Sequence, residues 1–249
     1  MALDVLITSG GTIAKIDDVR HLGNFSSGTT GCYIAEEFLK SGANVHYVYG
    51  KNAKCPFREN LRMNPKNSLT EEMARLSVAY AEFNSHLSRL HEYPIVTFEE
   101  YYAKVQNLLA HRKMDVVVLA AAVGDYGYAA QSGKLSSDKD GLVLEFVKNP
   151  KIISLVKEWN PSVYQVGFKL LSRVGEQELI DTAYKHGLKN HSDLTVANTL
   201  EDGSFAKRKI FFVTPEKEVT PVSERNLAGE LVKRVLENVG RDKLSIPIF

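Results

Sequence analysis

Two clusters of small polar residues near the N-terminus have the composition of a phosphate-binding site. The first is Ser9–Thr12, directly after the apolar run Val5–Ile7, and the second is Asn24–Gly31, which leads into a predicted helix. Glycines allow backbone N–H groups to approach a ligand closely, and the free N–H groups of a helix start attract anions. Two such clusters in one strand–helix unit predict a ligand with several negative groups.

Neither cluster matches an established nucleotide fingerprint. The first strand is not followed by G-x-G-x-x-G, and G-x-x-x-x-G-K-[ST] is absent from the chain. A simple turn explains Gly10 and Gly11 equally well, whereas the pattern Ser-Ser-Gly-x-x-Gly over Ser26–Gly31 is harder to explain without a ligand. The local pattern therefore predicts a phosphate-bearing ligand and leaves its identity open.

Further candidates follow the ends of other predicted strands, where parallel sheets bind their ligands. Asp125 follows the small-residue run Ala120–Gly124, and its carboxylate suits Mg²⁺, a sugar, a base or the cap of a turn. Phe168 ends a strand, where it either stacks on a base or belongs to the core. Asn149 and Pro150 precede a helix, whose start is either a second anion site or plain helix initiation.

Three lysines and one asparagine are weaker candidates. Lys134 lies in a polar loop, where solvent exposure is the simpler alternative to contact with a phosphate. Lys185 and Lys189 are spaced i, i+4 on a predicted helix, which is typical of a solvated face unless that face points at the site. Asn198 follows the end of a predicted strand. These side chains join the site only if the fold brings them to one edge of the sheet.

The composition is that of an ordinary globular α/β enzyme. The 249 residues, 44% hydrophobic and 24% charged, are enough for one large domain over residues 1–249. A net charge of +1 argues against nucleic-acid binding by bulk positive charge. Cys32 and Cys55 lack the spacing of a zinc site or a disulfide framework, so we expect free thiols. Without a signal segment or a long apolar run, we expect a cytoplasmic protein that does not contact a membrane.

Apolar strand-like runs alternate with helical patterns, which predicts a doubly wound, Rossmann-like, mostly parallel sheet with helices on both faces. The predicted strands are Leu3–Thr8, Asn44–Tyr49, Pro94–Thr97, Asp115–Ala121, Val163–Phe168 and Asp193–Ala197. The predicted helices are Gly31–Lys40, Leu69–His91, Thr97–His111, Lys151–Glu158 and Gly175–Gly187. A C-terminal β-hairpin, Lys209–Thr214 with Glu218–Val222, precedes a helix over Ser223–Val239. Residues 51–70 are a long irregular connection.

Together these residues resemble the phosphopantothenoylcysteine synthetase family, also called phosphopantothenate–cysteine ligase, of coenzyme A biosynthesis. The resemblance spans nearly the whole chain and is to the stand-alone form, without a fused flavin-dependent decarboxylase. The motifs that carry it are Ile7–Thr12, Val19–Arg20, Asn24–Gly28, Ala120–Asp125, Lys134, Lys148–Pro150, Gly167–Lys169 and Ala197–Asn198.

The resemblance implies a two-step reaction. The carboxylate of 4′-phosphopantothenate attacks a nucleoside triphosphate to give an acyl-nucleotide, acyl-cytidylate or acyl-adenylate, and pyrophosphate. The amine of L-cysteine then displaces CMP or AMP, and Mg²⁺ held mainly by the triphosphate neutralises its charge. The stand-alone form implies CTP rather than ATP, although Gly167–Leu170 is closer to the ATP-using eukaryotic members and Leu171 replaces a common acidic residue. A homodimer is also implied, with the hairpin over 209–222 as our candidate interface.

The resemblance implies roles for individual residues as well. Asn24 would hold the acyl carbonyl of the intermediate, Arg20 would add a cation nearby, and Lys134 would contact the triphosphate. Asp125 and Phe168 would face the nucleoside. The other nucleotide-binding residues implied are Gly10, Gly11, Ser26, Ser27, Gly28, Ala121, Asn149, Pro150, Lys185 and Lys189, and Asn198 is implied as a second substrate-binding residue.

Two other functions are open on the sequence alone. An NAD(P)-dependent reductase on a similar sheet needs a glycine-rich turn after the first strand, which Gly10 and Gly11 partly supply. It also needs an acidic residue at the end of the second strand, and Tyr49–Lys51 lacks one. A non-catalytic nucleotide-binding module would bind a nucleotide without turnover.

Overall fold

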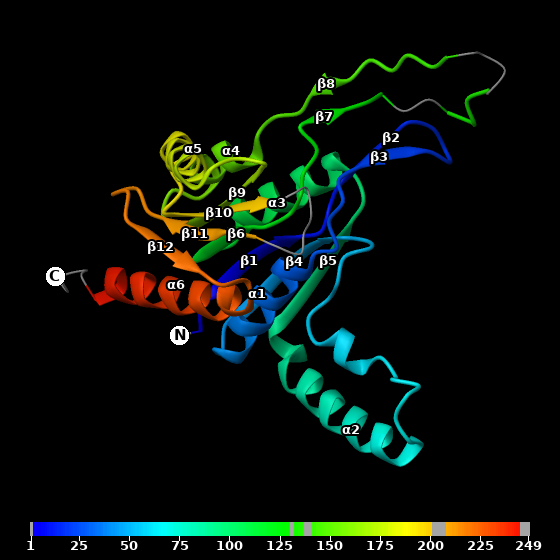
Figure 1. Ribbon diagram of the computed structural model, residues 1–249, viewed down its shortest axis with the longest axis vertical. Coiled ribbons are helices and arrows are strands. Elements are labelled where there is room, and N and C mark those ends of the chain that lie inside the picture. Colours follow the sequence, from blue (N-terminus) through cyan, green and yellow to red (C-terminus); the bar gives the residue numbers. More distant parts are fainter. Residues whose placement is uncertain (1, 130–131, 137–140, 201–207, 245–249) are drawn as a thin grey trace.

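The computed structural model describes residues 2–129, 132–136, 141–200 and 208–244 of the chain. Its centre is an eight-stranded sheet in the order β12-β11-β10-β9-β6-β1-β4-β5 (Figure 1). The parallel strands are β1 (Asp4–Ser9), β4 (Asn44–Gly50), β5 (Leu90–Ile95), β6 (Val116–Leu119), β9 (Tyr164–Ser172) and β10 (Leu194–Leu200). β11 (Ile210–Val213) and β12 (Val219–Val222) continue the sheet antiparallel at one edge. The predicted fold class and the C-terminal hairpin are confirmed.

The direction in which parallel strands are added to the sheet reverses at β1. β4 and β5 lie on one side of β1, and β6, β9 and β10 lie on the other, which is the order of doubly wound nucleotide-binding sheets. β1 and β6 are neighbours at this switch point, with Val5 opposite Val116 and Thr8 opposite Leu119. Since such sheets bind ligands beyond the carboxyl ends of their strands at this point, the segments after β1 and β6 form the expected site.

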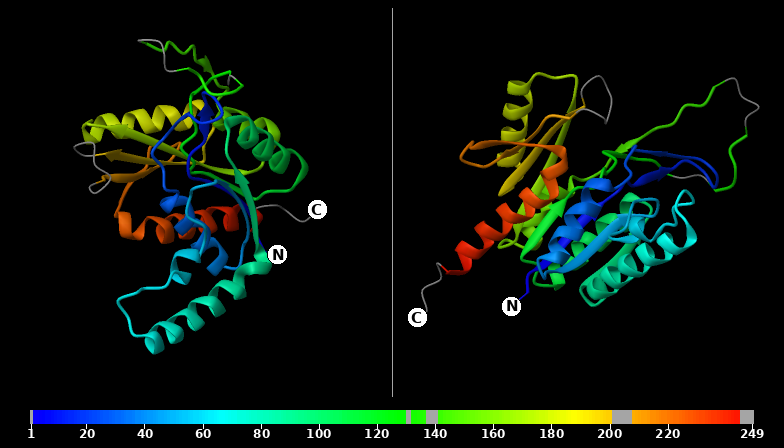
Figure 2. Two further views of the ribbon diagram at one scale, coloured as in Figure 1. Left: turned by 90° about the vertical axis from the view of Figure 1, so that its right-hand side faces the viewer. Right: turned by 60° about the horizontal axis from the view of Figure 1, so that its bottom comes forward.

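Helices cover both faces of this sheet (Figure 2). α1 (Thr29–Lys40) and α6 (Leu227–Leu244) cover one face. The helices of the other face are α3 (Phe98–His111), α4 (Ile152–Trp159) and α5 (Glu176–Lys189). The chain thus forms three layers, and the loops at the carboxyl ends of the strands stay open to a ligand.

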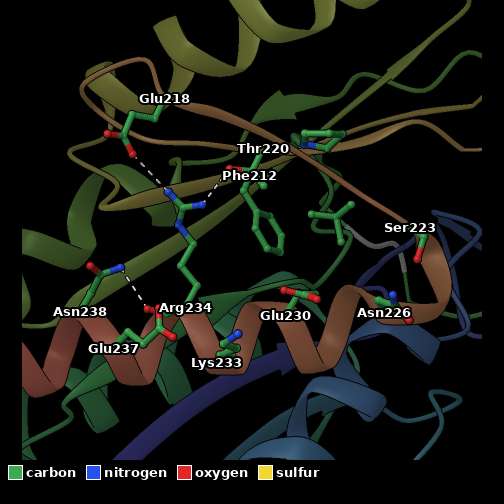
Figure 3. Close-up of a pocket in the computed structure, with 12 residues that line it drawn as sticks. Phe212, Glu218, Thr220, Ser223, Asn226, Glu230, Lys233, Arg234, Glu237 and Asn238 are labelled. Carbon is green, nitrogen blue, oxygen red and sulfur yellow. Dashed lines mark hydrogen bonds and ion pairs between the residues drawn. The ribbon is translucent and has the colours of Figure 1, made fainter.

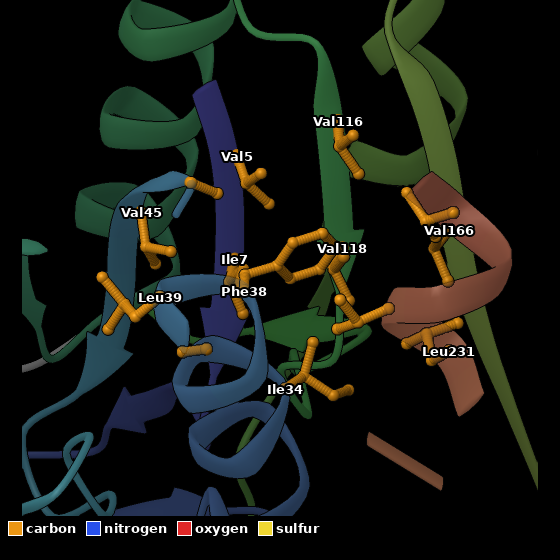
Figure 4. Close-up of a cluster of buried hydrophobic side chains, with 14 of the residues drawn as sticks. Val5, Ile7, Ile34, Phe38, Leu39, Val45, Val116, Val118, Val166 and Leu231 are labelled. Carbon is orange, nitrogen blue, oxygen red and sulfur yellow. The ribbon is translucent and has the colours of Figure 1, made fainter. Parts of the chain in front are cut away.

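The two faces of the central strand are both apolar, as a covered parallel sheet requires. Along β1, Val5 and Ile7 belong to the cluster under α1 and α6, whereas Leu6 belongs to the cluster under α3 and α4. Figure 4 shows the first cluster, in which Phe38 of α1 and Leu231 of α6 lie over the sheet. This buried layer holds β1 and α1 rigidly, and the site is built at their junction.

The predicted helix Leu69–His91 is too long, and the strand predicted at Pro94 begins earlier. α2 (Leu69–His86) starts with a capping box between Ser68 and Glu71 and stands away from the sheet (Figure 1). A 3-10 turn follows, and β5 begins at Leu90, which pairs with Val45 of β4. Strand pairing therefore overrides the helical spacing of Leu90 and His91. The irregular connection before α2 contains one 3-10 helix, Arg58–Leu61.

Two short two-stranded sheets were not predicted. β2 (Ile13–Lys15) pairs with β3 (His21–Gly23), and β7 (Tyr126–Gly127) pairs with β8 (Val147–Lys148). Both extend away from the central sheet on the same side (Figure 1), and we call them together the arm. The arm grows out of the loops that follow β1 and β6, so it borders the expected site.

The remaining differences concern the ends of elements. β9 and β10 run beyond their predicted ends to Ser172 and Leu200, so Asn198 lies inside a strand. α6 starts at Leu227 after a 3-10 turn, instead of at Ser223. Among the described residues, no helix is both long and apolar enough to cross a membrane.

Candidate functional site

The turn after β1 is packed too closely against its neighbours to leave room for side chains. Gly10 has a φ of +75°, and a Cβ there would lie 2.6 Å from the Cβ of Ala53. Gly11 bridges to Ala122 beyond β6, and the N–H of Ala122 donates to the carbonyl of Gly10 at 2.7 Å. A Cβ on Gly11 would lie 3.3 Å from the carbonyl oxygen of Asn24. The two glycines therefore let the backbone after β1 pack directly against its neighbours, and this turn borders the crevice between the ends of β1 and β6.

The N-terminus of α1 faces this crevice. Gly28, with a φ of +71°, precedes the helix, and Ser9 Oγ donates to its carbonyl at 2.9 Å. Ser9 lies against the first turn because Gly31 has no side chain; a Cβ there would be 2.5 Å from Ser9 Oγ. Within the described chain no side chain caps α1, and its first turn holds no acidic residue. Its N–H groups and positive partial charge are therefore available to an anion.

A cavity of about 630 Å³, here called the α1 cavity, opens on this helix end. One wall is Phe25–Gly31, and another is Ala120–Ala122 after β6. The third comes from the ends of β9 and β10, with Phe168 and Asn198. The α1 cavity thus brings together six of the predicted residues: Ser26, Ser27, Gly28, Ala121, Phe168 and Asn198.

Two polar side chains enter the α1 cavity from the β10–β11 side. Asn198 has a buried Oδ1 that lacks a hydrogen-bond partner in the described part of the chain. Arg208 lines the same cavity, and its Nε lies 3.6 Å from a carboxylate oxygen of Glu224. Sequence reasoning missed Arg208, because it neither ends a strand nor belongs to a motif. Its guanidinium adds a positive charge to a cavity that already contains a helix N-terminus.

A second cavity, of about 510 Å³, lies between the β2–β3 hairpin and the loop after β6 and is called the hairpin cavity. Asn24, Asp125 and Asn149 line it. Asn24 Nδ2 donates to the carbonyl of Ala122 at 3.2 Å, so this amide lies at the border between the hairpin cavity and the α1 cavity. Asn149 Nδ2 donates to the carbonyl of Gly124 at 3.0 Å and holds the loop after β6.

A third cavity, of about 170 Å³, adjoins the other two and is called the small cavity. It shares Ala121 and Phe168 with the α1 cavity and Asp125 with the hairpin cavity. Asp125 Oδ1 accepts from Lys151 Nζ at 3.1 Å. Pro150, just before α4, and His186, on α5, also line it. His186 was not predicted, because nothing in its local pattern distinguishes it from the neighbouring lysines.

Arg20 and Lys134 lie together on the arm. Asp17, a buried carboxylate in the β2–β3 turn, accepts from the Arg20 guanidinium at 2.6 Å and from the N–H of Leu135 at 3.0 Å. Arg20 also donates to the carbonyl of Leu135 at 2.7 Å. The guanidinium holds the pKa of the Asp17 carboxyl well below its usual range. We call Asp17, Arg20 and Leu135 the clasp, because they fasten the segment that carries the exposed Lys134 to the hairpin.

Other predicted residues stay apart from the three cavities. Lys185 and Lys189 are exposed on α5 and line none of these cavities. Cys32 and Cys55 are buried free thiols, as expected, and burial raises the pKa of the Cys32 thiol, so it is not a poised nucleophile. In the described part of the chain, no group of three or more His, Cys, Asp or Glu side chains is arranged to hold a metal ion.

A polar groove of about 540 Å³ lies between β12 and α6 (Figure 3). Arg234 of α6 reaches across the groove to the β12 side, where Nη1 donates to Thr220 Oγ1 at 3.0 Å and Nη2 lies 3.5 Å from Glu218. The groove lies at the edge strand of the sheet, away from the switch point.

Comparison with known proteins gives consistent results. A sequence profile of the family described as DNA/pantothenate metabolism flavoprotein C-terminal domain matches residues 2–80 and 74–239. The coenzyme A biosynthesis bifunctional protein CoaBC of Thermococcus kodakarensis is 33% identical over 229 residues, which cover 91% of this chain and 49% of that protein. The phosphopantothenate–cysteine ligase of Homo sapiens is 26% identical over 268 residues, which cover 94% of this chain and 84% of that protein.

The solved structures agree with the fold. The DNA/pantothenate metabolism flavoprotein from Streptococcus pneumoniae superposes with a TM-score of 0.75 at 28% identity, covering 95% of this chain and 100% of that chain. The chain spans about half the length of the first curated relatives it matches, which are bifunctional proteins.

Proposed function

Because the chain belongs to the DNA/pantothenate metabolism flavoprotein C-terminal domain family, we propose that it is a phosphopantothenate–cysteine ligase of coenzyme A biosynthesis. The proposed reaction joins 4′-phosphopantothenate and L-cysteine through an acyl-nucleotide and releases pyrophosphate. The observation that carries the proposal is the meeting of two cavities at Asn24 and Ala122. A transfer between two bound substrates needs such a junction, where the reacting groups are held side by side.

The triphosphate is proposed to bind in the α1 cavity. The uncapped start of α1 offers backbone N–H groups, and Ser26 and Ser27 offer hydroxyls beside it. Arg208 supplies a guanidinium on the opposite side of the same cavity. These donors suit the several negative groups that the sequence pattern predicts. Cleavage between the α- and β-phosphates then occurs next to Ala122, which borders the second cavity.

The hairpin cavity is proposed to hold the acyl substrate. Asn24 is exposed, and its side chain has a single hydrogen bond to the described residues, to the Ala122 carbonyl, so its amide can turn to a ligand at little cost. An amide N–H₂ donates to developing negative charge on an acyl carbonyl without adding a titrating group. We therefore propose Asn24 as the residue that stabilises the acyl-nucleotide while the amine of cysteine attacks it.

Mg²⁺ is proposed to be held mainly by the triphosphate. Of the predicted site residues only Asp125 carries a carboxylate, and that carboxylate is already paired with Lys151. One engaged carboxylate fits a Mg²⁺ ion whose other ligands are phosphate oxygens and water. When bound, the ion would neutralise phosphate charge. CTP stays our favoured nucleotide over ATP.

A homodimer is proposed through the arm. Large apolar side chains are exposed on both of its hairpins, with Val143 at 96%, Val147 at 68% and Leu22 at 55%. By contrast, β11 is buried, and among the large apolar side chains of the described β11–β12 hairpin only Val219 is exposed, at 37%. We therefore prefer the arm to the hairpin over 209–222 as the interface. A partner subunit in this position would receive Arg20 and Lys134 near its own cavities.

The deciding experiment is pyrophosphate release from 4′-phosphopantothenate, L-cysteine and Mg²⁺, measured with CTP and with ATP in separate reactions. We expect release with at least one nucleotide and amide product in equal amount. The Asn24→Ala variant is expected to keep its thermal melt, because the exposed side chain contributes little to the core, and to lose amide formation by about 100-fold. Nucleotide binding without turnover would instead support the non-catalytic module and overturn the proposal.

A further inference from the structure

The segment over residues 51–57 follows β4 and is anchored at both of its ends. The N–H of its first residue donates to the carbonyl of Ile95 at 2.9 Å. At the other end, the N–H of Phe57 donates to Glu36 Oε1 of α1 at 2.7 Å, and the Phe57 ring stacks on His86 of α2 at 4.8 Å. The middle of the 51–57 segment is therefore held in a fixed place between β5 and α1.

The middle of this segment touches the residues that lead into α1. The methyl group of Ala53 lies in the space that Gly28 leaves open, since a Cβ on Gly28 would lie 2.7 Å from it. The N–H of Lys54 donates to the carbonyl of Ser27 at 2.9 Å. This hydrogen bond fixes the orientation of the peptide bond between Ser27 and Gly28.

Two N–H groups at the start of α1 take their direction from such contacts. In a trans peptide the C=O and N–H groups point to opposite sides, so the N–H of Gly28 points away from Lys54. Ser9 Oγ donates to the carbonyl of Gly28 at 2.9 Å, which directs the N–H of Thr29 away from Ser9 in the same way. Gly28 and Thr29 both line the α1 cavity, and the Gly28 N–H has no acceptor among the described residues. Successive N–H groups of this kind suit an anion.

The hydroxyl of Tyr47 on β4 supports this arrangement from inside the core. Tyr47 is fully buried in the cluster under α1 and α6, and its hydroxyl donates to the carbonyl of Lys54 at 2.8 Å. Burial raises the pKa of the Tyr47 hydroxyl above its usual value, so the group keeps its proton and stays a donor. The backbone of Lys54 thus connects Tyr47 with Ser27. Tyr47 itself lines none of the three cavities.

We propose that Tyr47 is a positioning residue for the phosphates of the bound substrate. Through Lys54, its hydroxyl holds the Ser27–Gly28 peptide bond in the orientation in which the Gly28 N–H meets a phosphate oxygen in the α1 cavity. The proposal rests on the proposed function, because it takes the nucleoside triphosphate as the ligand. Loss of the hydroxyl alone leaves the Lys54 carbonyl without this donor, so the backbone of Lys54 and the carbonyl of Ser27 can shift together.

Isothermal titration of the full chain with inorganic tripolyphosphate and Mg²⁺ tests the proposal without a nucleoside. We expect Tyr47→Phe to bind tripolyphosphate about threefold to tenfold more weakly than the wild type, the effect of one lost neutral hydrogen bond. Tyr164→Phe is the matched control, because the Tyr164 hydroxyl accepts from Asn238 Nδ2 at 3.3 Å and Tyr164 lines none of the three cavities. It should bind tripolyphosphate as tightly as the wild type.

Two further measurements distinguish positioning from a general loss of structure. Hydrogen exchange at the Lys54 N–H should become about threefold or more faster in Tyr47→Phe and stay unchanged in Tyr164→Phe. In pyrophosphate release, the KM for the nucleotide should rise in Tyr47→Phe by the factor seen in the titration. The kcat should stay within about twofold of the wild type, because the lost contact serves the ground state and the transition state alike.

The other outcomes have distinct meanings. Equal tripolyphosphate affinity of Tyr47→Phe and the wild type, or equal weakening in both variants, overturns the role of Tyr47 and leaves the proposed function intact. Unchanged exchange at Lys54 in Tyr47→Phe also overturns the inference, as does a wild type that does not bind tripolyphosphate. If the wild type binds tripolyphosphate but releases no pyrophosphate with CTP or ATP, the proposed function fails, and the titrations of the two variants still decide the role of Tyr47.

Discussion

At the scale of single residues, the site depends on glycines, which have no side chain. Gly10, Gly28 and Gly31 each lie where a Cβ would meet Ala53 or Ser9 at 2.5 to 2.8 Å. Because these glycines lack a Cβ, β1, the start of α1 and the segment after β4 come together around the turn that we propose to bind an anion. The close approach of backbones, rather than any single contact, creates the surface that we propose to bind phosphate.

Substitution of Gly28 is expected to lower the stability of the folded chain. Gly28→Ala places a Cβ in the left-handed region and 2.7 Å from the Cβ of Ala53, so we expect a loss of about 2 to 4 kcal/mol in the free energy of unfolding. Gly42→Ala is the matched control, because Gly42 also has a positive φ, +90°, but nothing lies within 4 Å of its Cβ position. It should cost only about 1 kcal/mol. Urea unfolding of both variants measures the difference, and equal losses would contradict the steric argument.

Residue patterns predicted which residues line the cavities better than they predicted which face of α5 meets the small cavity. Asp125 follows β6 and Phe168 lies in β9, and both line one cavity because the carboxyl ends of parallel strands meet at one edge of the sheet. His186 was missed because the packing of Gly187 on Thr195 decides which side of α5 meets the cavity. No local pattern carries that information. The roles of Lys134, Lys185 and the other predicted residues stay predictions.

At the scale of elements, the strands of the arm are short. β2 and β3 have three residues each, and β7 and β8 have two each, which is too short for a periodic pattern to reveal. The predicted start of β5 was wrong for a different reason, because pairing with β4 outweighs the helical spacing of Leu90 and His91. The long apolar strands and amphipathic helices were predictable because their burial repeats over several residues.

The clasp is expected to control the order of the arm. Asp17→Ala removes the acceptor of the Leu135 N–H, so exchange of that amide with solvent should become at least about tenfold faster, the effect of one lost charge-assisted hydrogen bond. Asp18→Ala is the matched control, since Asp18 accepts from the N–H of Gly133 at 3.0 Å instead. It should speed exchange at Gly133 and leave Leu135 protected. Hydrogen exchange followed by NMR distinguishes the two amides.

At the scale of the whole molecule, one buried histidine links the stability of the sheet to pH. His46 of β4 is 2% exposed and stacks on His91 of β5 at 4.7 Å, and its Nδ1 lies 3.2 Å from the Tyr93 hydroxyl. Burial, with the charges of His91 and Arg112, lowers the pKa of His46 to about 4. Protonation of this ring is therefore opposed only in the folded state.

The free energy of unfolding is expected to fall as the pH falls. Between the ordinary histidine pKa of 6.5 and the folded value of about 4, the unfolded chain binds more protons, so stability is lost across this window. The contribution of His46 is at most about 3 kcal/mol. The lowered pKa of His186 adds to the loss in the same direction. Comparison of wild type with His46→Gln at each pH isolates the share of His46, and parallel curves would exclude it.

The proposed dimer predicts restoration of activity when two inactive variants are mixed. Asn24→Ala disables the cavity of its own subunit, and Lys134→Gln disables the arm. If each arm serves the partner, an equal mixture contains about half mixed dimers, each with one intact site, and should regain about one quarter of wild-type activity. Pyrophosphate release after subunit exchange measures this. A mixture as inactive as its components would show that each arm serves its own subunit.

The uncapped first turn of α1 also has a practical consequence, for the choice of buffer. If the nucleotide binds at this turn as proposed, an inorganic phosphate or sulfate ion in solution competes for the same N–H groups. By mass action such an ion stabilises the folded chain, and the stabilisation grows with the logarithm of the ion concentration once that concentration exceeds the dissociation constant. Melting temperatures measured in phosphate buffer therefore belong to a protein with an ion at this helix end, and those measured in a zwitterionic buffer belong to the free protein. Nucleotide affinities are best determined in the zwitterionic buffer.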